Sequence, residues 1–258
     1  MRSVWAAMLA MFLPAVSLVA QPGPAPSTVP FTIRGKVVTL RLYGPSSGEP
    51  IIVASGDGGW IHLGPHAADV LARAGYFVVG VDTRQYLESF TSGSTTLRPA
   101  DEPTDFRTLA EFSSRTTHTR PILVGVSEGA GLSVLAATDP ATRPAIKGVV
   151  GLGLPETNEL GWRWKDAVIY ITKGIPDEPT FSVSAIADRV APLPLAAIHS
   201  TRDEFVPVAD IQRIMGRAKE PKKLWIIAAS NHRFSGAEAE FDRRLIEAIE
   251  WVKANSRQ

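Results

Sequence analysis

The sequence predicts an α/β fold, a mostly parallel sheet of about eight strands flanked by helices, with an antiparallel start. Short apolar runs alternate with helical patterns from about residue 50 onward. This favours parallel pairing, because each intervening helix carries the chain back to the end of the sheet where the previous strand began. The first two runs, at residues 31–34 and 37–42, have no helix between them and predict an antiparallel pair. A length of 258 residues suits one domain of this kind.

The expected strands are short and rich in apolar or β-branched residues, the composition of a buried pleated sheet. In chain order they are residues 31–34, 37–42, 51–54, 77–81, 122–126, 149–152, 195–198 and 224–228. The expected helices are residues 66–74, 106–112, 128–137, 208–218 and 237–252. In the last helix, apolar residues recur at spacings of four, four and three and form one stripe: Phe241, Leu245, Ile249 and Val252.

Two stretches do not fit the alternation and are expected to be loop insertions. Residues 88–103 contain Ser, Thr, Gly and Pro without a period. Residues 156–189 include the string Trp-Arg-Trp-Lys at 162–165 and a strand-like run at 168–171. Both stretches follow expected strands, where loops cover the site in folds of this class.

The N-terminus carries the features of a secretory signal peptide over residues 1–20. Arg2 supplies a positive start, residues 4–19 are mostly apolar, and Ala20 is a small residue suited to cleavage. The alternative is a single membrane anchor, although polar residues interrupt a run that is shorter than the ~20 apolar residues of a span. We therefore expect a periplasmic or secreted protein.

Residues 21–29 are rich in proline and small residues and predict an extended leader, which places the folded domain at residues 30–258. The sequence contains no cysteine, so neither a disulfide nor a lipidated cysteine is available. Removing residues 1–20 takes away only Arg2 and changes 27 basic and 26 acidic residues to 26 of each. Without a basic stripe, no nucleic-acid partner is expected, and protein partners cannot be inferred.

The string Gly-Val-Ser-Glu-Gly at 125–129 directly follows an apolar run and precedes small, apolar, helix-compatible residues. This order of strand, GxSxG turn and buried helix is typical of a nucleophile elbow, in which glycines permit the tight turn that exposes a serine. The alternative is a Gly/Ser turn formed for packing alone. We interpret Ser127 as a nucleophile.

A nucleophilic serine needs a histidine base and a carboxylate that orients it. Asp203 follows the expected strand at 195–198, and His232 follows the last strand. Loops after parallel strands meet at one edge of the sheet, so these residues should converge with Ser127 in the chain order of an α/β-hydrolase. Glu204 and Asp210 are alternatives for the acid.

The remaining histidines, His62, His66, His118 and His199, are interpreted as surface or packing residues. No HxH or HExxH motif has the spacing of metal ligands, so neither a metal nor another cofactor is expected. The glycine-rich turn at 55–60 follows a strand at the position where this architecture supplies an oxyanion donor. The backbone N–H groups of Asp57 and Glu128 are therefore the candidates. A phosphate-binding role for this turn is disfavoured because its pattern fits neither common phosphate motif.

Three strings, Ser-Gly-Asp-Gly-Gly-Trp at 55–60, Gly-Val-Ser-Glu-Gly at 125–129 and Asn-His-Arg-Phe at 231–234, together resemble the bacterial virulence protein family of the VirJ/AcvB type. The resemblance runs from about residue 50 to the C-terminus. It implies an exported α/β-hydrolase whose serine, aspartate and histidine fall on Ser127, Asp203 and His232. The AcvB branch is associated with periplasmic hydrolysis of lysyl-phosphatidylglycerol. This chain departs from the GYSFG string of many members at Val126 and Glu128.

The expected function is therefore that of an exported serine hydrolase that cleaves carboxylic esters of small molecules or lipids, at a membrane surface in the lipid case. Asp57, Trp60 and Glu128 are the candidate substrate-binding residues, and either carboxylate could bind the ammonium of an aminoacyl ester. Equally, each carboxylate could only cap a turn or a helix. A general carboxylesterase is the second interpretation, and a non-catalytic binding or adaptor protein on a hydrolase scaffold is the third.

Overall fold

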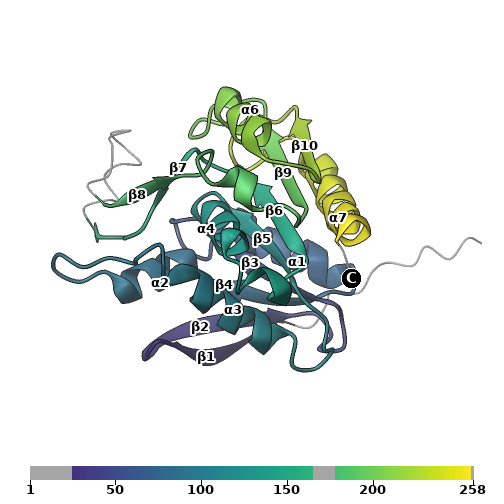
Figure 1. The fold of residues 1–258 in the computed structure, drawn as a ribbon. Coiled ribbons are helices and arrows are strands. Elements are labelled where there is room, and N and C mark those ends of the chain that lie inside the picture. Colours follow the sequence, from purple (N-terminus) through teal and green to yellow (C-terminus); the bar gives the residue numbers. More distant parts are fainter. Residues whose placement is uncertain (1–24, 165–177, 257–258) are drawn as a thin grey trace, which may run out of the picture.

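The computed structural model describes residues 25–164 and 178–256 and contains an eight-stranded sheet (Figure 1). Its strands are β1 Ser27–Ile33, β2 Lys36–Tyr43, β3 Pro50–Ala54, β4 Phe77–Val81, β5 Ile122–Val126, β6 Gly148–Leu152, β9 Leu195–Ser200 and β10 Lys222–Ile227. All eight strands expected from the sequence are present. The mostly parallel sheet with an antiparallel start is confirmed, since β2 pairs antiparallel with β1 and β4 while every later pair is parallel.

The sheet order is β1-β2-β4-β3-β5-β6-β9-β10, so the chain crosses over β3 when it passes from β4 to β5. The strand order reverses at this point, and the carboxyl ends of β3 and β5 face the crevice that such a reversal opens. Residues Ala54 and Gly125 are paired there, one residue before the glycine-rich turn and two before Ser127. The topology therefore places both candidate loops at the ligand-binding edge.

Helices cover both faces of the sheet (Figure 1). One core cluster packs α1 Leu63–Arg73 and α7 Glu238–Asn255 against the sheet. The other packs α2 Thr83–Phe90, α3 Glu102–Ser113, α4 Glu128–Thr138 and α6 Val208–Arg217. The stripe expected in the last helix is buried in the first cluster, and α4 is buried along its whole length, as its small and apolar residues require.

The loop expected at residues 88–103 is shorter in the structure, because α2 continues to Phe90 and α3 begins at Glu102. The local signal for α2 is weak: only three of its eight residues are buried. Its first turn is fixed by the Asp82 side chain, which accepts a hydrogen bond of 3.1 Å from the N–H of Gln85. Residues 91–101 form the remaining loop.

The folded domain begins at Ser27 rather than at residue 30, since the first three residues of β1 pair with the end of β2. Their backbone hydrogen bonds outweigh a composition that by itself favours an extended leader. The insertion at 156–189 holds a small antiparallel pair, β7 Thr157–Glu159 with β8 Thr180–Ser182, and a short 3-10 helix at Ala187–Arg189. The strand-like run at 168–171 and the signal peptide at 1–20 lie outside the described residues.

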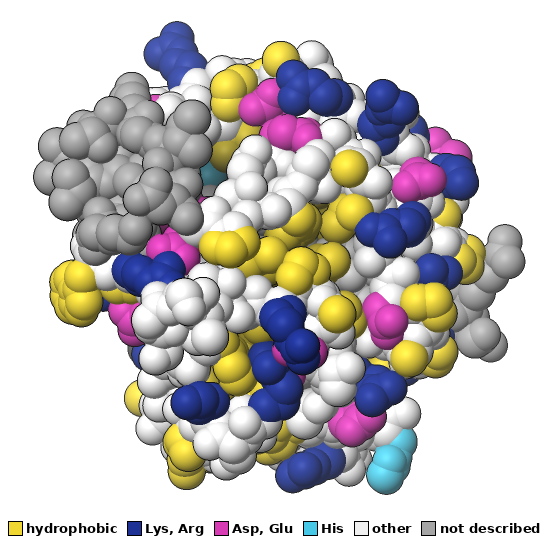
Figure 2. All heavy atoms as spheres, turned by 60° about the vertical axis from the view of Figure 1, so that its left-hand side comes forward, with side chains coloured by type: hydrophobic (Ala, Val, Ile, Leu, Met, Phe, Trp, Pro, Cys, Tyr) yellow, Lys and Arg dark blue, Asp and Glu magenta, His cyan; other side chains and the backbone are white. Residues whose placement is uncertain are grey.

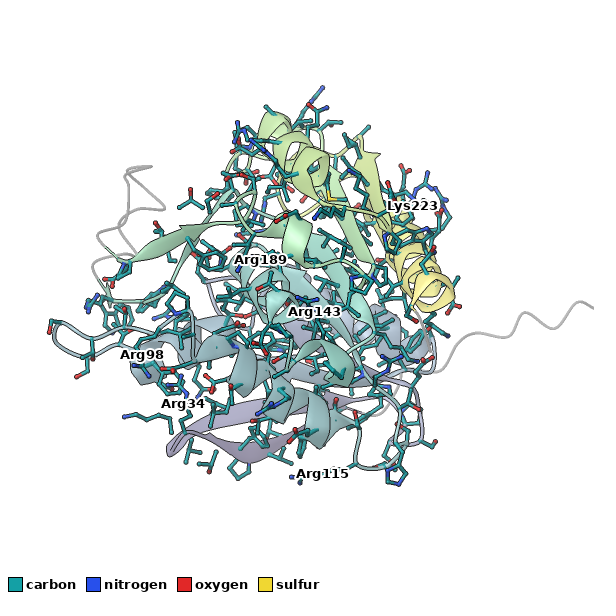
Figure 3. The ribbon with its side chains drawn as sticks, in the orientation of Figure 1. Arg34, Arg98, Arg115, Arg143, Arg189 and Lys223 are labelled. Atoms are coloured by element: carbon teal, nitrogen blue, oxygen red, sulfur yellow. The ribbon has the colours of Figure 1, made fainter. Side chains whose placement is uncertain are left out.

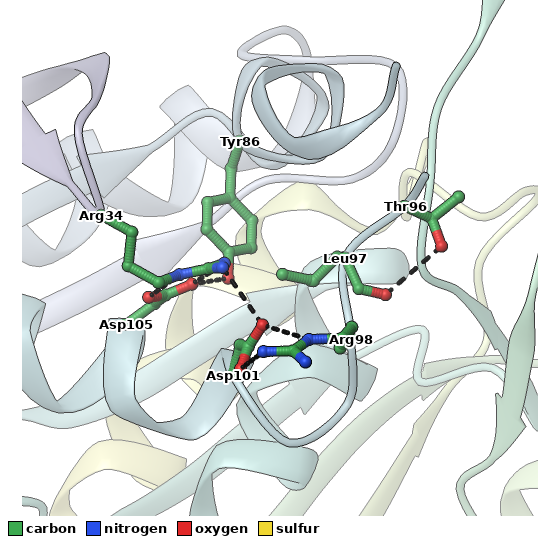
Figure 4. A network of polar contacts seen from close by, with 7 residues as sticks. All are labelled: Arg34, Tyr86, Thr96, Leu97, Arg98, Asp101 and Asp105. Atoms are coloured by element: carbon green, nitrogen blue, oxygen red, sulfur yellow. Dashed lines mark hydrogen bonds and ion pairs between the residues drawn. The ribbon is translucent and has the colours of Figure 1, made fainter. Parts of the chain in front are cut away.

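A polar network ties the β1–β2 hairpin to the helical layer (Figure 4). The guanidinium of Arg34 donates two hydrogen bonds of 2.7 Å to the carboxylate of Asp105 on α3, and the Tyr86 hydroxyl on α2 donates a third of 2.6 Å. Asp105 is almost fully buried, whereas the Arg34 side chain is 34% exposed. The network thus compensates a buried carboxylate with a cation at the protein surface.

Basic side chains are distributed over the molecule. The six labelled in Figure 3 lie on different elements, from the β1–β2 turn to β10. Figure 2 shows acidic, basic and hydrophobic side chains interspersed on the face beside β7 and β8. Among the described residues, no helix is both long and apolar enough to cross a membrane.

Candidate active site

Ser127 occupies a strained turn between β5 and α4. Its backbone has φ 48° and ψ −116°, a conformation that costs energy for any residue with a side chain. The flanking glycines are required by close packing: a Cβ on Gly125 would lie 2.3 Å from Cα of Ala130, and one on Gly129 would lie 2.4 Å from the carbonyl oxygen of Ser55. The GxSxG string therefore forms the elbow geometry expected from the sequence.

Asp203 and His232 form a close pair at the same edge of the sheet. Oδ2 of Asp203 lies 2.6 Å from Nδ1 of His232, and the side chains are 1% and 11% exposed. Oδ1 of Asp203 accepts hydrogen bonds of 3.0 and 2.8 Å from the N–H groups of Phe205 and Val206. Burial raises the pKa of Asp203, but the hydrogen bonds from His232 and from these N–H groups outweigh it, so the pKa is lowered overall.

An ionised Asp203 only accepts hydrogen bonds, so Nδ1 of His232 must carry the proton that points at it. Nε2 of His232 is then unprotonated in the neutral ring and can act as a base. The two alternatives for the acid are engaged elsewhere. Glu204 accepts a hydrogen bond of 2.7 Å from the backbone N–H of His232, and Asp210 pairs with Arg213 at 2.9 Å.

A cavity of about 430 Å³ brings the candidate residues together. Ser127, His232, Asp57 and Glu128 all line it. Its volume is in the range of small-molecule sites. Its wall also includes apolar side chains from three separate segments: Ile61, Trp162 and Phe205.

The glycine-rich turn lies directly beside the serine. A Cβ on Gly56 would be 3.5 Å from Cβ of Ser127, and the turn closes through a hydrogen bond of 3.1 Å from the N–H of Gly59 to the carbonyl of Gly56. Glu128 is the first residue of α4, so its N–H has no acceptor within the helix. Asp57 and Glu128 both line the cavity that Ser127 borders.

The carboxylate of Glu128 is buried at the cavity wall. It accepts a hydrogen bond from the N–H of Glu159 on β7, while the carbonyl of Glu128 accepts one of 2.9 Å from the Asn158 side chain. Burial, followed by the nearby carboxylates of Asp57 and Glu159, raises the pKa of Glu128 well above its ordinary value. Burial thus favours the protonated form of Glu128, and a nearby cation would favour the ionised form.

Trp60, a candidate substrate-binding residue, lies away from the cavity. Its indole N–H donates a hydrogen bond of 3.0 Å to the hydroxyl of Tyr43, and the ring covers Gly80, where a Cβ would lie 2.3 Å from it. Trp60 is not among the residues that line the cavity within the described chain. Its place is taken by Trp162, from the Trp-Arg-Trp-Lys string that the sequence assigns to an insertion.

Two further residues next to the pair have no role in the sequence analysis. Gly153 has φ 58°, and a Cβ there would lie 2.4 Å from Cε1 of His232. His199, interpreted from the sequence as a surface or packing residue, is fully buried near the end of β9, with Nε2 3.1 Å from the carbonyl oxygen of Val206. Gly153 and His199 each lie at or next to the carboxyl end of a strand of the sheet. This position is the only feature of the sequence that could have indicated them.

Comparison with known proteins supports the fold. The family described as bacterial virulence protein (VirJ) matches residues 50–166. No curated protein matches the sequence. Est1E from Butyrivibrio proteoclasticus has a TM-score of 0.64 at 14% identity, with 88% of this chain and 99% of that chain covered. The Pyrococcus furiosus esterase Pf2001 has 0.65 at 18% identity, covering 88% and 90%. A dienelactone hydrolase from Anabaena variabilis has 0.62 at 16% identity, covering 89% and 98%.

These solved structures share the overall fold of the chain. The VirJ match includes that turn and the elbow but ends before Asp203 and His232. The protein therefore has the α/β-hydrolase fold, and its residues 50–166 match the bacterial virulence protein (VirJ) family.

Proposed function

We propose that the protein is a serine esterase that uses Ser127, His232 and Asp203. The observation that carries this proposal is the 2.6 Å contact between Asp203 and Nδ1 of His232 at the wall of a cavity that also holds the strained Ser127. This contact orients the histidine so that Nε2 can accept the serine proton.

In the proposed reaction, Oγ of Ser127 bonds to the ester carbonyl carbon as its proton passes to Nε2 of His232. The N–H groups of Asp57 and Glu128 stabilise the oxyanion. The C–O bond to the alcohol then breaks, and the alcohol takes the proton from His232. Water repeats these steps on the acyl-enzyme, releasing the carboxylic acid and restoring the serine.

For the acyl group, we propose an aminoacyl ester such as lysyl-phosphatidylglycerol. Asp57, Glu128 and Glu159 line the cavity, and their carboxyl groups could bind a substrate ammonium. A cation beside Glu128 would favour its ionised form, so binding would be coupled to release of a proton.

A general carboxylesterase is the second candidate. The raised pKa of Glu128 favours its protonated form, and Ile61, Trp162 and Phe205 give the cavity apolar walls. These features suit a neutral acyl group equally well. Export to the periplasm through a signal peptide at residues 1–20 is part of the proposal and would be tested by N-terminal sequencing of envelope-fraction protein, expected to begin near Gln21.

The experiment compares the purified wild type with Ser127→Ala. A fluorophosphonate probe should label only the wild type, at Ser127. Total membrane lipid incubated with each protein and followed by mass spectrometry should lose one ester class to the wild type alone. Labelling that survives Ser127→Ala would overturn the assignment of the nucleophile, and a wild type without labelling or turnover would favour a non-catalytic binding protein.

A further inference from the structure

His199 is a buried histidine that the proposed mechanism does not use. It lies near the end of β9, is fully buried, and places Nε2 3.1 Å from the carbonyl oxygen of Val206. Its Nδ1 is buried and has no hydrogen-bond partner among the described residues. An unpaired buried nitrogen is unfavourable, and an apolar side chain would avoid it. The presence of histidine here therefore calls for a reason other than stability.

The protonation state of His199 follows from its surroundings. A carbonyl oxygen only accepts, so Nε2 must carry the proton that it donates to Val206. Burial lowers the pKa of His199, and the neighbouring His232 acts in the same direction. Asp203, Asp210 and the Val206 carbonyl oppose this shift but do not overcome it. The ring is a neutral donor with a fixed tautomer.

His199 donates its hydrogen bond to Val206, and the N–H group of Val206 in turn donates to Asp203. The N–H of Val206 donates to Oδ1 of Asp203 at 2.8 Å, and the N–H of Phe205 does so at 3.0 Å. With Oδ1 held by these two donors, Oδ2 points at Nδ1 of His232 at 2.6 Å. A continuous chain of hydrogen bonds therefore runs from β9 through the 203–206 loop to the imidazole of His232.

Few side chains of this loop pack into the core, so hydrogen bonds carry most of its positioning. Glu204 and Phe205 are exposed, and within the loop only Val206 packs into the core, at 4% exposed. Short loops with exposed backbones sample alternative conformations unless hydrogen bonds oppose them. His199 supplies a donor from an interior strand of the sheet, which is the arrangement that preorganises a catalytic group.

We propose that His199 is a positioning residue: its Nε2–H group fixes the Val206 carbonyl and so holds Asp203 in the orientation that its contact with His232 requires. This inference rests on the proposed esterase function. It assigns a specific atom, Nε2 of His199, to the task.

Three substitutions of His199 separate the hydrogen bond from simple packing. His199→Gln keeps a donor near the position of Nε2, His199→Asn places its amide near Nδ1 and cannot reach Val206, and His199→Leu fills the space without a donor. Each variant is compared with the wild type in fluorophosphonate labelling rate, in kcat and KM for a p-nitrophenyl ester, in Tm, and in the low-field proton NMR signal of the Asp203–His232 hydrogen bond. Titration with the probe corrects every rate for the active fraction.

We expect His199→Gln to retain the wild-type labelling rate and the low-field proton signal. His199→Asn and His199→Leu should lower kcat roughly tenfold to hundredfold with little change in KM, because the acid is displaced while the cavity is intact. The low-field signal should weaken in both variants. These changes should not follow Tm, since His199→Leu removes an unpaired nitrogen while His199→Asn does not.

The outcomes separate this inference from the proposed function. If the wild type is labelled and turns over substrate, and if His199→Gln, His199→Asn and His199→Leu do so at the same rates, the role of His199 is overturned and the esterase function stands. Loss of activity in all three variants in proportion to their Tm would also overturn it, because packing would then explain the effect. A wild type without labelling would refute the esterase, whereas the NMR signal would still report whether His199 orients Asp203.

Discussion

Gly153 offers a direct test of how tightly the His232 imidazole is held. A Cβ at this position would lie 2.4 Å from Cε1 and 2.9 Å from Nδ1 of His232, where ordinary contact begins at 3.4 Å. The difference of 3.4 − 2.4 = 1.0 Å is the shift that Gly153→Ala forces on the ring or on the backbone. The ring is packed between Asp203, at 2.6 Å, and Phe205, whose centroid lies 5.6 Å away, so it cannot move without disturbing one of them.

A misplacement of about 1 Å in a catalytic group can lower activity on the order of 10²-fold, so we expect kcat/KM of Gly153→Ala to fall about a hundredfold. The backbone adds a second effect, because alanine at φ 58° is strained by about 1–2 kcal/mol. The assays are kcat/KM with a p-nitrophenyl ester, fluorophosphonate labelling rate and thermal unfolding.

Gly93→Ala is the matched control. Gly93 has φ 53°, close to that of Gly153, and a Cβ there would meet nothing within 4 Å. This variant should share the loss of stability from backbone strain and keep full activity. If Gly153→Ala and Gly93→Ala retained equal activity, the steric argument would be refuted, and the imidazole would have to be more mobile than its contacts indicate.

Three further predictions follow from the polar contacts. Asp203→Asn should lower kcat by roughly 10⁴-fold, measured against the same ester. Because the folded pKa of Asp203 lies below its ordinary value of 3.8, its ionised form stabilises the fold above that pH, and this contribution is lost as the pH falls through the lower folded pKa. Asp203→Asn should therefore flatten the acid limb of the stability profile below about pH 4, whereas an unchanged limb would contradict the assignment. Glu128→Gln removes the carboxylate but keeps an acceptor for the N–H of Glu159. It should therefore reduce the kcat/KM preference for a lysyl ester over a neutral ester about tenfold to a hundredfold. An unchanged ratio would favour the general esterase. Arg34→Ala leaves the buried Asp105 without its cation and should cost about 2 kcal/mol in urea unfolding. Arg98→Ala removes a pair whose cation is 76% exposed and should cost clearly less, and equal losses would show that burial does not govern these pairs.

Patterns local in the sequence determined the strand and helix layers. The alternation of apolar runs placed all eight strands of the main sheet, because hydrophobic periodicity reflects burial directly. The glycines at 125 and 129 predicted the elbow for a similar reason, since close backbone approach leaves room for no other residue. The short helix α2 was missed because its eight residues bury only three side chains and its start depends on one capping aspartate.

The pairing of distant side chains was decided only by the tertiary structure. Chain order allowed Asp203, Glu204 or Asp210 as the partner of the His232 ring. In the structure Asp203 contacts that ring, whereas Glu204 accepts a hydrogen bond from the backbone N–H of His232. Trp60 looked available to a ligand in a glycine-rich string, yet a glycine on β4 leaves a space that its ring fills. The sequence left His199 as either a surface or a packing residue, and its position on β9 buries it beside the loop that carries Asp203. The local sequence encodes hydrophobic periodicity and the backbone constraints of glycine. The direction and surroundings of a single side chain depend instead on residues that are far away in the chain.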